Sequence, residues 1–213
     1  MTIEAKICGL KTEADIDAAI AYGADYIGLV FFEPSPRHLT ISRAKSLADH
    51  ARGKSQIVAL TVDANDQLIN EINEHVRPDL FQLHGSETVD RVAAISAASA
   101  CRIMKVIKVA TVDDVEQRSQ YQTVADKILF DAKAPPDSKL PGGNGLAFDW
   151  RILETVRGHL DYMLSGGLTA DNVASAIQLT GTQAVDVSSG VERAPGEKDP
   201  ARIRAFLKAA KGL

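Results

Sequence analysis

Short apolar runs alternate with longer amphipathic stretches along the whole chain. Runs that are bounded by turn residues and rich in β-branched side chains are typical of buried strands. The sequence contains eight of them, at residues 3–8, 26–32, 57–62, 79–83, 103–109, 127–131, 161–165 and 184–188. We therefore predict eight strands, each followed by a segment able to form a helix.

The stretches between these runs begin with residues that commonly cap helices. Thr, Ser, Asn and Asp side chains accept hydrogen bonds from the first free N–H groups of a helix. The predicted helix starts are Thr12, Thr40, Asn65 and Ser86, and later helices are predicted to begin near Thr111, Asp149, Thr169 and Asp199. Pro200 follows the last of these, in the first helical position that proline favours. The stretch 112–122 is polar and weakly periodic, so we expect a short helix there.

Eight strand-and-helix units in 213 residues predict an α/β fold, a single-domain (β/α)8 TIM barrel over residues 1–213. An open doubly wound sheet is the alternative. Polar residues at the carboxyl ends of the runs favour the barrel, because those ends converge on one mouth. They are Cys8, His84, Lys108, Asp131, Ser165 and Ser188. No linker rich in Gly and Ser interrupts the chain, which supports one domain.

Composition narrows the class of protein. The 24 Lys and Arg against 28 Asp and Glu give a formal charge of −4, which argues against nucleic acid or an anionic membrane as a partner. No signal peptide or membrane-spanning stretch is evident, so a cytoplasmic location is expected. Cys8 and Cys101 are the only thiols, and neither has Cys or His neighbours at metal spacing. We expect no disulfide and no metal site.

Cys8 ends the first run, where a thiol can take part in chemistry. Side chains alternate across a strand, so Lys6 and Cys8 face the same side. A nearby cation favours the thiolate, which makes Cys8 a candidate base. The alternative is that Cys8 is a small buried hydrophobe, as free cysteines usually are. Cys101 precedes the fifth run, at the opposite rim, and is expected only to pack.

Asp131 ends the sixth run and is a candidate acid. A carboxyl group at the end of an apolar strand is costly unless it is paired, hydrogen-bonded or protonated. A salt bridge to Lys133 or a cap on the next loop would explain it without any function.

The last two strand ends carry candidate phosphate loops. Glycine lets backbone N–H groups approach an anion closely, and barrels often bind phosphate after strands seven and eight. The candidates are Gly166 and Gly167 in one loop and Ser189 and Gly190 in the next. Ordinary turn chemistry is the alternative for both.

Three further features are candidates for contact with a ligand. Arg37 ends a loop stiffened by proline and is able to bind a carboxylate through two parallel hydrogen bonds, although by itself it reads as a solvated surface residue. Gln82 and His84 share one face of the fourth strand and are candidates for orienting a substrate. The loop from Pro135 to Gly145 is long for its position and is a candidate lid.

Taken together, these segments resemble the phosphoribosylanthranilate isomerase family. The resemblance runs from residue 3 to about residue 199, in the order of the family's motifs. It rests on Lys6-Ile7-Cys8-Gly9-Leu10, Gly28-Leu29-Val30-Phe31, Ser35-Pro36-Arg37, Gln82-Leu83-His84-Gly85, Leu129-Phe130-Asp131, Gly142-Gly143-Asn144-Gly145, Phe148-Asp149-Trp150, Ser165-Gly166-Gly167-Leu168 and Asp186-Val187-Ser188-Ser189-Gly190-Val191-Glu192.

The resemblance implies an isomerase of tryptophan biosynthesis that carries out an Amadori rearrangement with no metal or organic cofactor. It implies Cys8 as general base, Asp131 as general acid and Arg37 as the partner of the anthranilate carboxylate. The phosphate of a small-molecule substrate is implied to lie on the turns at Gly166-Gly167 and Ser189-Gly190. Lys6 and Asp186 join Gln82 and His84 as candidates for orienting that substrate. A monomer is expected.

Two other functions stay open at this point. Related sugar-phosphate barrels of histidine biosynthesis, including bifunctional versions, use an aspartate where Cys8 stands, so the thiol argues against them. A noncatalytic phosphate-ligand sensor need not keep an acid, a base and a phosphate loop together.

Overall fold

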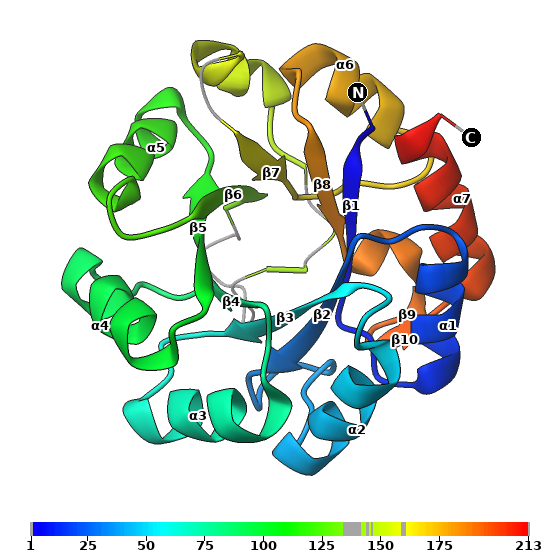
Figure 1. The fold of residues 1–213 in the computed structure, drawn as a ribbon. Coiled ribbons are helices and arrows are strands. Elements are labelled where there is room, and N and C mark those ends of the chain that lie inside the picture. The colour runs from blue at the N-terminus through cyan, green and yellow to red at the C-terminus, as the bar shows by residue number, and fades with distance from the viewer. Residues whose placement is uncertain (1, 134–141, 144, 146, 159–160, 213) are drawn as a thin grey trace.

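The computed structural model describes residues 2–133, 142–143, 145, 147–158 and 161–212. Its centre is a closed barrel of eight parallel strands, in which each strand pairs with its neighbours in chain order and β1 closes against β8 (Figure 1). The strands are β1 (Glu4–Cys8), β2 (Tyr26–Phe31), β3 (Gln56–Thr61), β4 (Leu80–Leu83), β5 (Arg102–Val109), β6 (Lys127–Ala132), β7 (Tyr162–Leu164) and β8 (Ala184–Val187). All eight predicted runs are confirmed to within one residue at each end.

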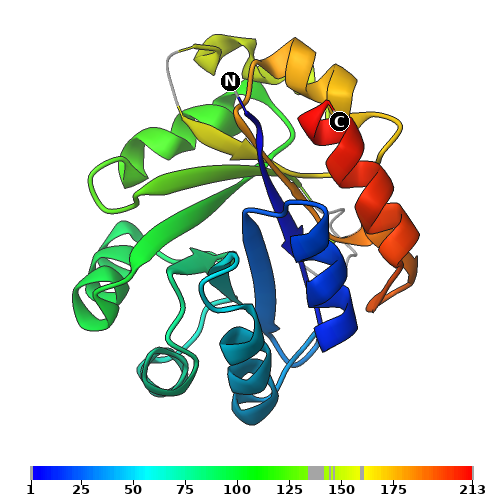
Figure 2. The same cartoon turned by 45° about the vertical axis from the view of Figure 1, so that its right-hand side comes forward.

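Helices surround the barrel and cover its outer face (Figure 2). The α-helices are α1 (Glu13–Ala21), α2 (Ile41–Ala51), α3 (Asp66–Glu71), α4 (Val89–Ser99), α5 (Val112–Glu116), α6 (Val173–Thr180) and α7 (Pro200–Lys211). A π-helical turn, η1 (Ile72–Val76), extends α3. Short 3-10 helices are η2 (Gln117–Tyr121), η3 (Trp150–Val156) and η4 (Ser189–Val191), and a two-stranded hairpin is formed by β9 (Glu192–Ala194) and β10 (Glu197–Lys198).

Most predicted helix starts are confirmed. Thr12, Thr40, Asn65, Thr111 and Asp199 all cap helices through their side chains, and Asp149 caps η3. The fifth helix is short, as its polar sequence predicts, and it continues as η2.

Two predicted starts are wrong. The fourth helix begins after Thr88 instead of Ser86, because the Ser86 N–H donates to Asp63 Oδ1 and holds a turn. The seventh predicted helix, α6, begins after Asn172 instead of near Thr169, because Asn172 Oδ1 accepts the Thr169 N–H and closes a turn of its own.

Apolar side chains fill the barrel in two layers. One cluster lies between the strands and the helices and includes Ile7, Leu29, Phe81, Phe130 and Phe206. A smaller cluster fills the inside of the barrel. Its members are Tyr26, Val58, Leu80, Met104, Val106, Leu129, Met163 and Ala184. The inner cluster closes the barrel below its mouth, so the open space lies at the carboxyl ends of the strands.

Three aspartates fasten pairs of strands at the amino-terminal rim, and we call them the aspartate clamps. Asp25, Asp79 and Asp126 each precede an even-numbered strand. Their carboxylates accept the N–H groups of Ala5, Ile57 and Ile103 in the preceding odd-numbered strand, each at 2.7 Å. Their own N–H groups donate to the carbonyls of those same three residues. Gln183 holds the corresponding place before β8. Within the described residues, no helix is long and apolar enough to cross a membrane.

Candidate active site

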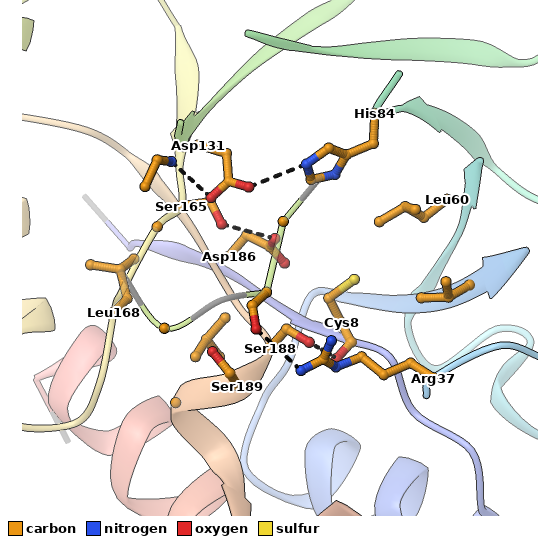
Figure 3. Close-up of a pocket in the computed structure, with 18 of the residues that line it drawn as sticks. Cys8, Arg37, Leu60, His84, Asp131, Ser165, Leu168, Asp186, Ser188 and Ser189 are labelled. Carbon is orange, nitrogen blue, oxygen red and sulfur yellow. Dashed lines mark hydrogen bonds and ion pairs between the residues drawn. The ribbon is translucent and has the colours of Figure 1, made fainter. Parts of the chain in front are cut away.

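A cavity of about 830 Å³, including the solvent at its opening, lies at the carboxyl ends of the strands. It is lined by nearly all of the predicted site residues, which reach it from β1, β2, β4, β6, β7 and β8 or from the loops that follow them. They are Cys8, Arg37, Gln82, His84, Asp131, Gly166, Gly167, Asp186, Ser189 and Gly190. Figure 3 shows Cys8 and Arg37 on one side of this cavity and Asp131 with His84 on the other.

Two predicted residues do not line the cavity. Lys6 is fully buried beneath it, where its ammonium group donates to Asp186 Oδ1 at 2.8 Å. It therefore supports the floor of the site and does not face a ligand. Lys108, at the end of β5, also lies outside the lining.

Cys8 is buried among Val30 and Leu60, with its sulfur against the backbone of β2. The absence of a side chain at Gly28 leaves room for this sulfur, because a β-carbon at Gly28 would lie 2.8 Å from Cys8 Sγ. Burial raises the pKa of the Cys8 thiol, and the nearby ammonium groups of Lys6 and Lys198 lower it only in part. The cation beside Cys8 lowers the pKa of the thiol, as predicted, but desolvation raises this pKa by more. The resting form is therefore the thiol.

Asp131 is buried at the end of β6. A salt bridge to Lys133, the non-functional explanation for an acid at this place, is not formed. Lys133 instead lies 3.4 Å from Asp114. Asp131 Oδ1 accepts the N–H of Ala132 at 3.0 Å, and Oδ2 lies 3.2 Å from His84 Nε2. The second pair is close but is not aligned as a hydrogen bond, so His84 Nε2 has no hydrogen-bond partner among the described residues. One carboxyl oxygen of Asp131 is thus available to a ligand or to His84.

Gln82 and His84 form a polar pair on the wall of the cavity. Gln82 Nε2 lies 3.3 Å from His84 Nδ1, while Gln82 Oε1 is buried with no hydrogen-bond partner in the described part of the chain. Buried polar atoms normally have partners, and those that lack one frequently mark a site that receives a ligand or water.

Arg37 is buried, not solvated as its sequence alone suggests. Its Nε donates to Glu192 Oε1 at 2.7 Å and its Nη2 to Glu192 Oε2 at 2.8 Å. One edge of the guanidinium is therefore already occupied. A ligand carboxylate would have to approach the remaining edge, which carries Nη1 and where Nη2 also makes a long contact of 3.5 Å with the carbonyl of Gly143. Gly143 lies beside that edge, and a β-carbon there would be 2.7 Å from Nη1.

The two glycine loops lie against each other. Gly166 and Gly167 have positive φ angles of 90° and 65°, which favour glycine. A β-carbon at Gly190 would lie 2.0 Å from the carbonyl oxygen of Leu168, so only glycine allows this approach. In the described residues, the N–H groups at Gly166, Gly167, Ser189 and Gly190 donate to no backbone carbonyl. Such free donors are the groups that bind anions.

The predicted lid falls mostly outside the described residues. Of the loop from Pro135 to Gly145, the structure describes Gly142, Gly143 and Gly145, and all three line the cavity. A β-carbon at Gly142 would lie 2.8 Å from Asp131 Oδ2. This part of the loop therefore lies directly beside the candidate acid.

Sequence reasoning missed two buried charged residues near the site, Glu192 and Lys198. Glu192 belongs to the last motif of the family resemblance, but nothing local in the sequence indicates that it contacts a residue 155 positions away. The part of the chain that the structure describes contains no group of three or more His, Cys, Asp or Glu able to hold a metal ion.

The chain matches known proteins over nearly its whole length. Residues 5–209 match the sequence model of the family described as N-(5'-phosphoribosyl)anthranilate (PRA) isomerase. The N-(5'-phosphoribosyl)anthranilate isomerase of Rhodopseudomonas palustris strain BisA53 is 53% identical over 211 residues, which cover 99% of this chain and 97% of that relative. The Rhizobium meliloti protein of the same name is 48% identical, and the alignment covers 99% of this chain and 98% of that relative.

Solved structures show the same likeness. Phosphoribosyl anthranilate isomerase from Thermotoga maritima superposes with a TM-score of 0.89 at 33% identity, covering 99% of this chain and all of that one. Another structure of such an isomerase, in complex with reduced 1-(o-carboxyphenylamino)-1-deoxyribulose 5-phosphate, has a TM-score of 0.86 at 32% identity, with the same coverage. On this evidence, the chain belongs to the N-(5'-phosphoribosyl)anthranilate isomerase family.

Proposed function

We propose that this chain converts N-(5-phosphoribosyl)anthranilate to 1-(2-carboxyphenylamino)-1-deoxyribulose 5-phosphate, with Asp131 as general acid and Cys8 as general base. The chain is an isomerase of tryptophan biosynthesis, in the class that interconverts aldoses and ketoses. The observation that carries the residue assignment is that Cys8, Asp131, Arg37 and both glycine loops line a single cavity.

The reaction needs an acid first. Asp131, in its neutral form, protonates the ring oxygen of the furanose, and the ring opens to a Schiff base. Asp131 lines the cavity, and its Oδ2 lies beside His84 and Gly142, which supports this role.

The base acts next. The Cys8 thiolate removes the proton from C2' of the Schiff base, which gives an enolamine that tautomerises to the ketone. Because burial raises the pKa of the thiol, the protein must lose the thiol proton before this step, and only a fraction of molecules carry the thiolate at neutral pH. Lys6 and Lys198 lower the pKa of Cys8 and so increase that fraction.

Two anchors hold the substrate at its ends. The free N–H groups of the glycine loops support binding of the phosphate, and the Nη1 edge of Arg37 supports binding of the anthranilate carboxylate. Holding both ends places the sugar between acid and base, which lowers the entropic part of the barrier.

The acid and base assignment is tested by Cys8→Ala and Asp131→Asn. General acid or base catalysis contributes roughly 10² to 10⁴ in rate, so each variant should lose turnover by about that factor. Cys101→Ala and Asp171→Asn are matched controls, since neither residue lines the cavity. Turnover is followed by the loss of substrate, with folding checked by circular dichroism. If both site variants keep near-parental turnover, the assignment fails.

The same assay defines the substrate range. We propose activity on the anthranilate-derived substrate alone, because Cys8 stands where the histidine-biosynthesis barrels use an aspartate. Turnover of the aminoaldose phosphate of that pathway at a comparable rate would instead indicate a bifunctional enzyme. Binding of the reduced product analogue without any turnover would indicate a sensor.

A cytoplasmic monomer also stays a prediction. The Thermotoga maritima enzyme is described as dimeric, and monomeric forms of it have been generated. Sedimentation of this chain at assay concentration measures its own oligomeric state.

A further inference from the structure

Glu192 is a buried acid that the proposed mechanism does not use. It begins β9, directly after the second glycine loop, and only 6% of its surface is exposed. Both of its carboxylate oxygens accept hydrogen bonds from Arg37, and Oε1 also accepts one from Lys198. A buried carboxylate with two cationic partners is well compensated, so its presence alone needs no ligand.

Its contact with Arg37 fixes the orientation of the guanidinium. Two parallel hydrogen bonds, at 2.7 and 2.8 Å, join the two planar groups edge to edge. A bidentate pair of this kind constrains the direction of the guanidinium plane as well as its position. Nη1 thereby lies beside Gly143, and both residues line the cavity.

Lys198 anchors Glu192 to the rest of the site. Its ammonium group donates to Glu192 Oε1 at 2.8 Å, to the carbonyl of Ser188 at 2.9 Å and to Ser188 Oγ at 3.2 Å. An ammonium group has three hydrogens, so these contacts use all of them and leave none for a ligand. The Ser188 hydroxyl in turn donates to the carbonyl of Cys8 at 3.1 Å.

The charges of this cluster also fit an anionic ligand. Arg37 and Lys198 carry two positive charges and Glu192 one negative charge, which leaves one positive charge in a buried setting. A ligand carboxylate at the Nη1 edge would neutralise it, and a neutral ring in the same place would not.

We propose that Glu192 is a positioning residue that aims Arg37 at the carboxylate of the ligand and so sets the preference for carboxylated over non-carboxylated aryl ligands. This inference rests on the proposed role of Arg37 in binding that carboxylate.

The test compares two probes that differ only in the carboxylate. One is reduced 1-(o-carboxyphenylamino)-1-deoxyribulose 5-phosphate, and the other is the same molecule with an unsubstituted phenyl ring. The ratio of their Kd values measures carboxylate selectivity, because both probes share the phosphate and the sugar. Calorimetric titration gives this ratio for the wild type, Glu192→Gln, Arg37→Met and the double variant.

Glu192→Gln should lower the selectivity about tenfold or more, since a hydrogen bond between charged groups is lost and the guanidinium is no longer aimed. In the Arg37→Met background, the same change should have almost no further effect on the ratio. A merely structural role for Glu192 would weaken both probes alike and leave the ratio unchanged.

The chain offers a matched control in Glu13, whose carboxylate makes the same bidentate contact with Arg43 but is only partly buried and does not line the cavity. Glu13→Gln should keep the wild-type selectivity. If Glu192→Gln does not fold, Glu192→Asp carries the test, because it keeps the charge but is too short to hold both nitrogens of Arg37.

The outcomes separate the two proposals. An unchanged ratio in Arg37→Met would show that Arg37 does not bind the carboxylate, and the proposed function of Arg37 would fail. A lower ratio in Arg37→Met with an unchanged ratio in Glu192→Gln, or in Glu192→Asp where that variant is used, would overturn the present inference alone.

Discussion

At the scale of single residues, the site combines groups whose ionisation depends on burial. Cys8 is the clearest case, because desolvation raises its pKa while two cations lower it. A thiol in such a setting reacts slowly with alkylating agents until the pH approaches its raised pKa, since only the thiolate is nucleophilic.

We therefore predict that alkylation of Cys8 by iodoacetamide continues to accelerate above pH 9. The measurement uses a Cys101→Ser background, so that Cys8 is the only thiol, and follows the mass of the protein over time. The midpoint of the pH dependence reports ionisation, whereas limited access changes only the overall rate. Unfolded protein in urea provides the reference, with the midpoint of an ordinary cysteine. A folded-state midpoint below pH 8 would show that the two ammonium groups outweigh burial.

Gly28 allows a second prediction about the same sulfur. A methyl group at this position would lie 2.8 Å from Cys8 Sγ and 3.0 Å from Cys8 Cα, both closer than normal contacts. Overpacking a core costs about 1–3 kcal/mol, so Gly28→Ala should unfold at lower urea concentration and turn over more slowly. The loss of stability should be smaller in a Cys8→Ala background, where the nearest clashing atom is gone. Equal losses in both backgrounds would show that the sulfur is not what Gly28 accommodates.

The chemical groups of the site can be predicted from the sequence, whereas most of the contacts between them cannot. Cys8 and Asp131 are recognisable because each is a reactive side chain at the end of an apolar run. The buried state of Arg37 is not recognisable, because its partner lies 155 residues away and the loop around it is polar. Glu192 and Lys198 were missed for the same reason, since nothing local distinguishes them from exposed charges.

At the scale of elements, sequence patterns predicted strands better than helix starts. A buried parallel strand is a continuous apolar run, and its ends are set by the change in hydrophobicity. The starts of α4 and α6 depend on turns in which Asp63 accepts the N–H of Ser86 and Asn172 accepts the N–H of Thr169. The sequence around Ser86 and Thr169 does not indicate these hydrogen bonds. Tertiary contacts and local turns thus determine where these two helices begin, and capping residues alone do not.

The aspartate clamps give a prediction at this scale. Asp79→Ala removes the acceptor of the Ile57 N–H, and the loss of one hydrogen bond to a charged group should cost about 1.5–3 kcal/mol. Urea unfolding measures this cost, and kcat/KM should stay at the wild-type value because Asp79 lies on the rim opposite the cavity. Asp79→Asn, which keeps an acceptor oxygen, should restore part of the stability. A large fall in kcat/KM would contradict the prediction that the amino-terminal rim contributes to stability but not to catalysis.

At the scale of the whole molecule, one apolar cluster includes residues from β1 to α7. We propose that residues 1–213 form one domain and unfold in a single transition. Coincident unfolding curves from fluorescence and circular dichroism would support this, and separated curves would contradict it.

Buried acids make the stability of the whole molecule sensitive to low pH. The pKa of Glu87 is lowered because Lys105 and two backbone N–H groups outweigh its desolvation. The pKa of Glu192 is lowered because Arg37 and Lys198 do the same. An acid with a lowered folded-state pKa stabilises fully above its unfolded value of about 4.5, and this contribution disappears as the pH falls through the folded value.

The urea midpoint should therefore fall steeply below pH 4.5. Glu87→Gln should be less stable at pH 7 but should show a shallower fall, because it no longer takes up a proton on unfolding at low pH. Glu33→Gln, a change of the same kind at an exposed residue, serves as the control. A parallel fall in Glu87→Gln and the wild type would show that this carboxylate does not contribute to acid sensitivity.

The aspartate clamps occur in three of the four pairs of strands, and each joins partners within one pair: β1 with β2, β3 with β4, and β5 with β6. In each of these three quarters of the barrel, the aspartate and the amide that it holds both come from the same quarter, and Asp25 alone also accepts a hydrogen bond from Lys211 of α7, at 2.7 Å. If a quarter were exchanged as a unit with that of a related barrel, its aspartate clamp would be transferred with it. A cut between the two strands of a pair would instead separate an aspartate from the amide that it holds. Recombination between relatives should accordingly be tolerated best at the boundaries between pairs.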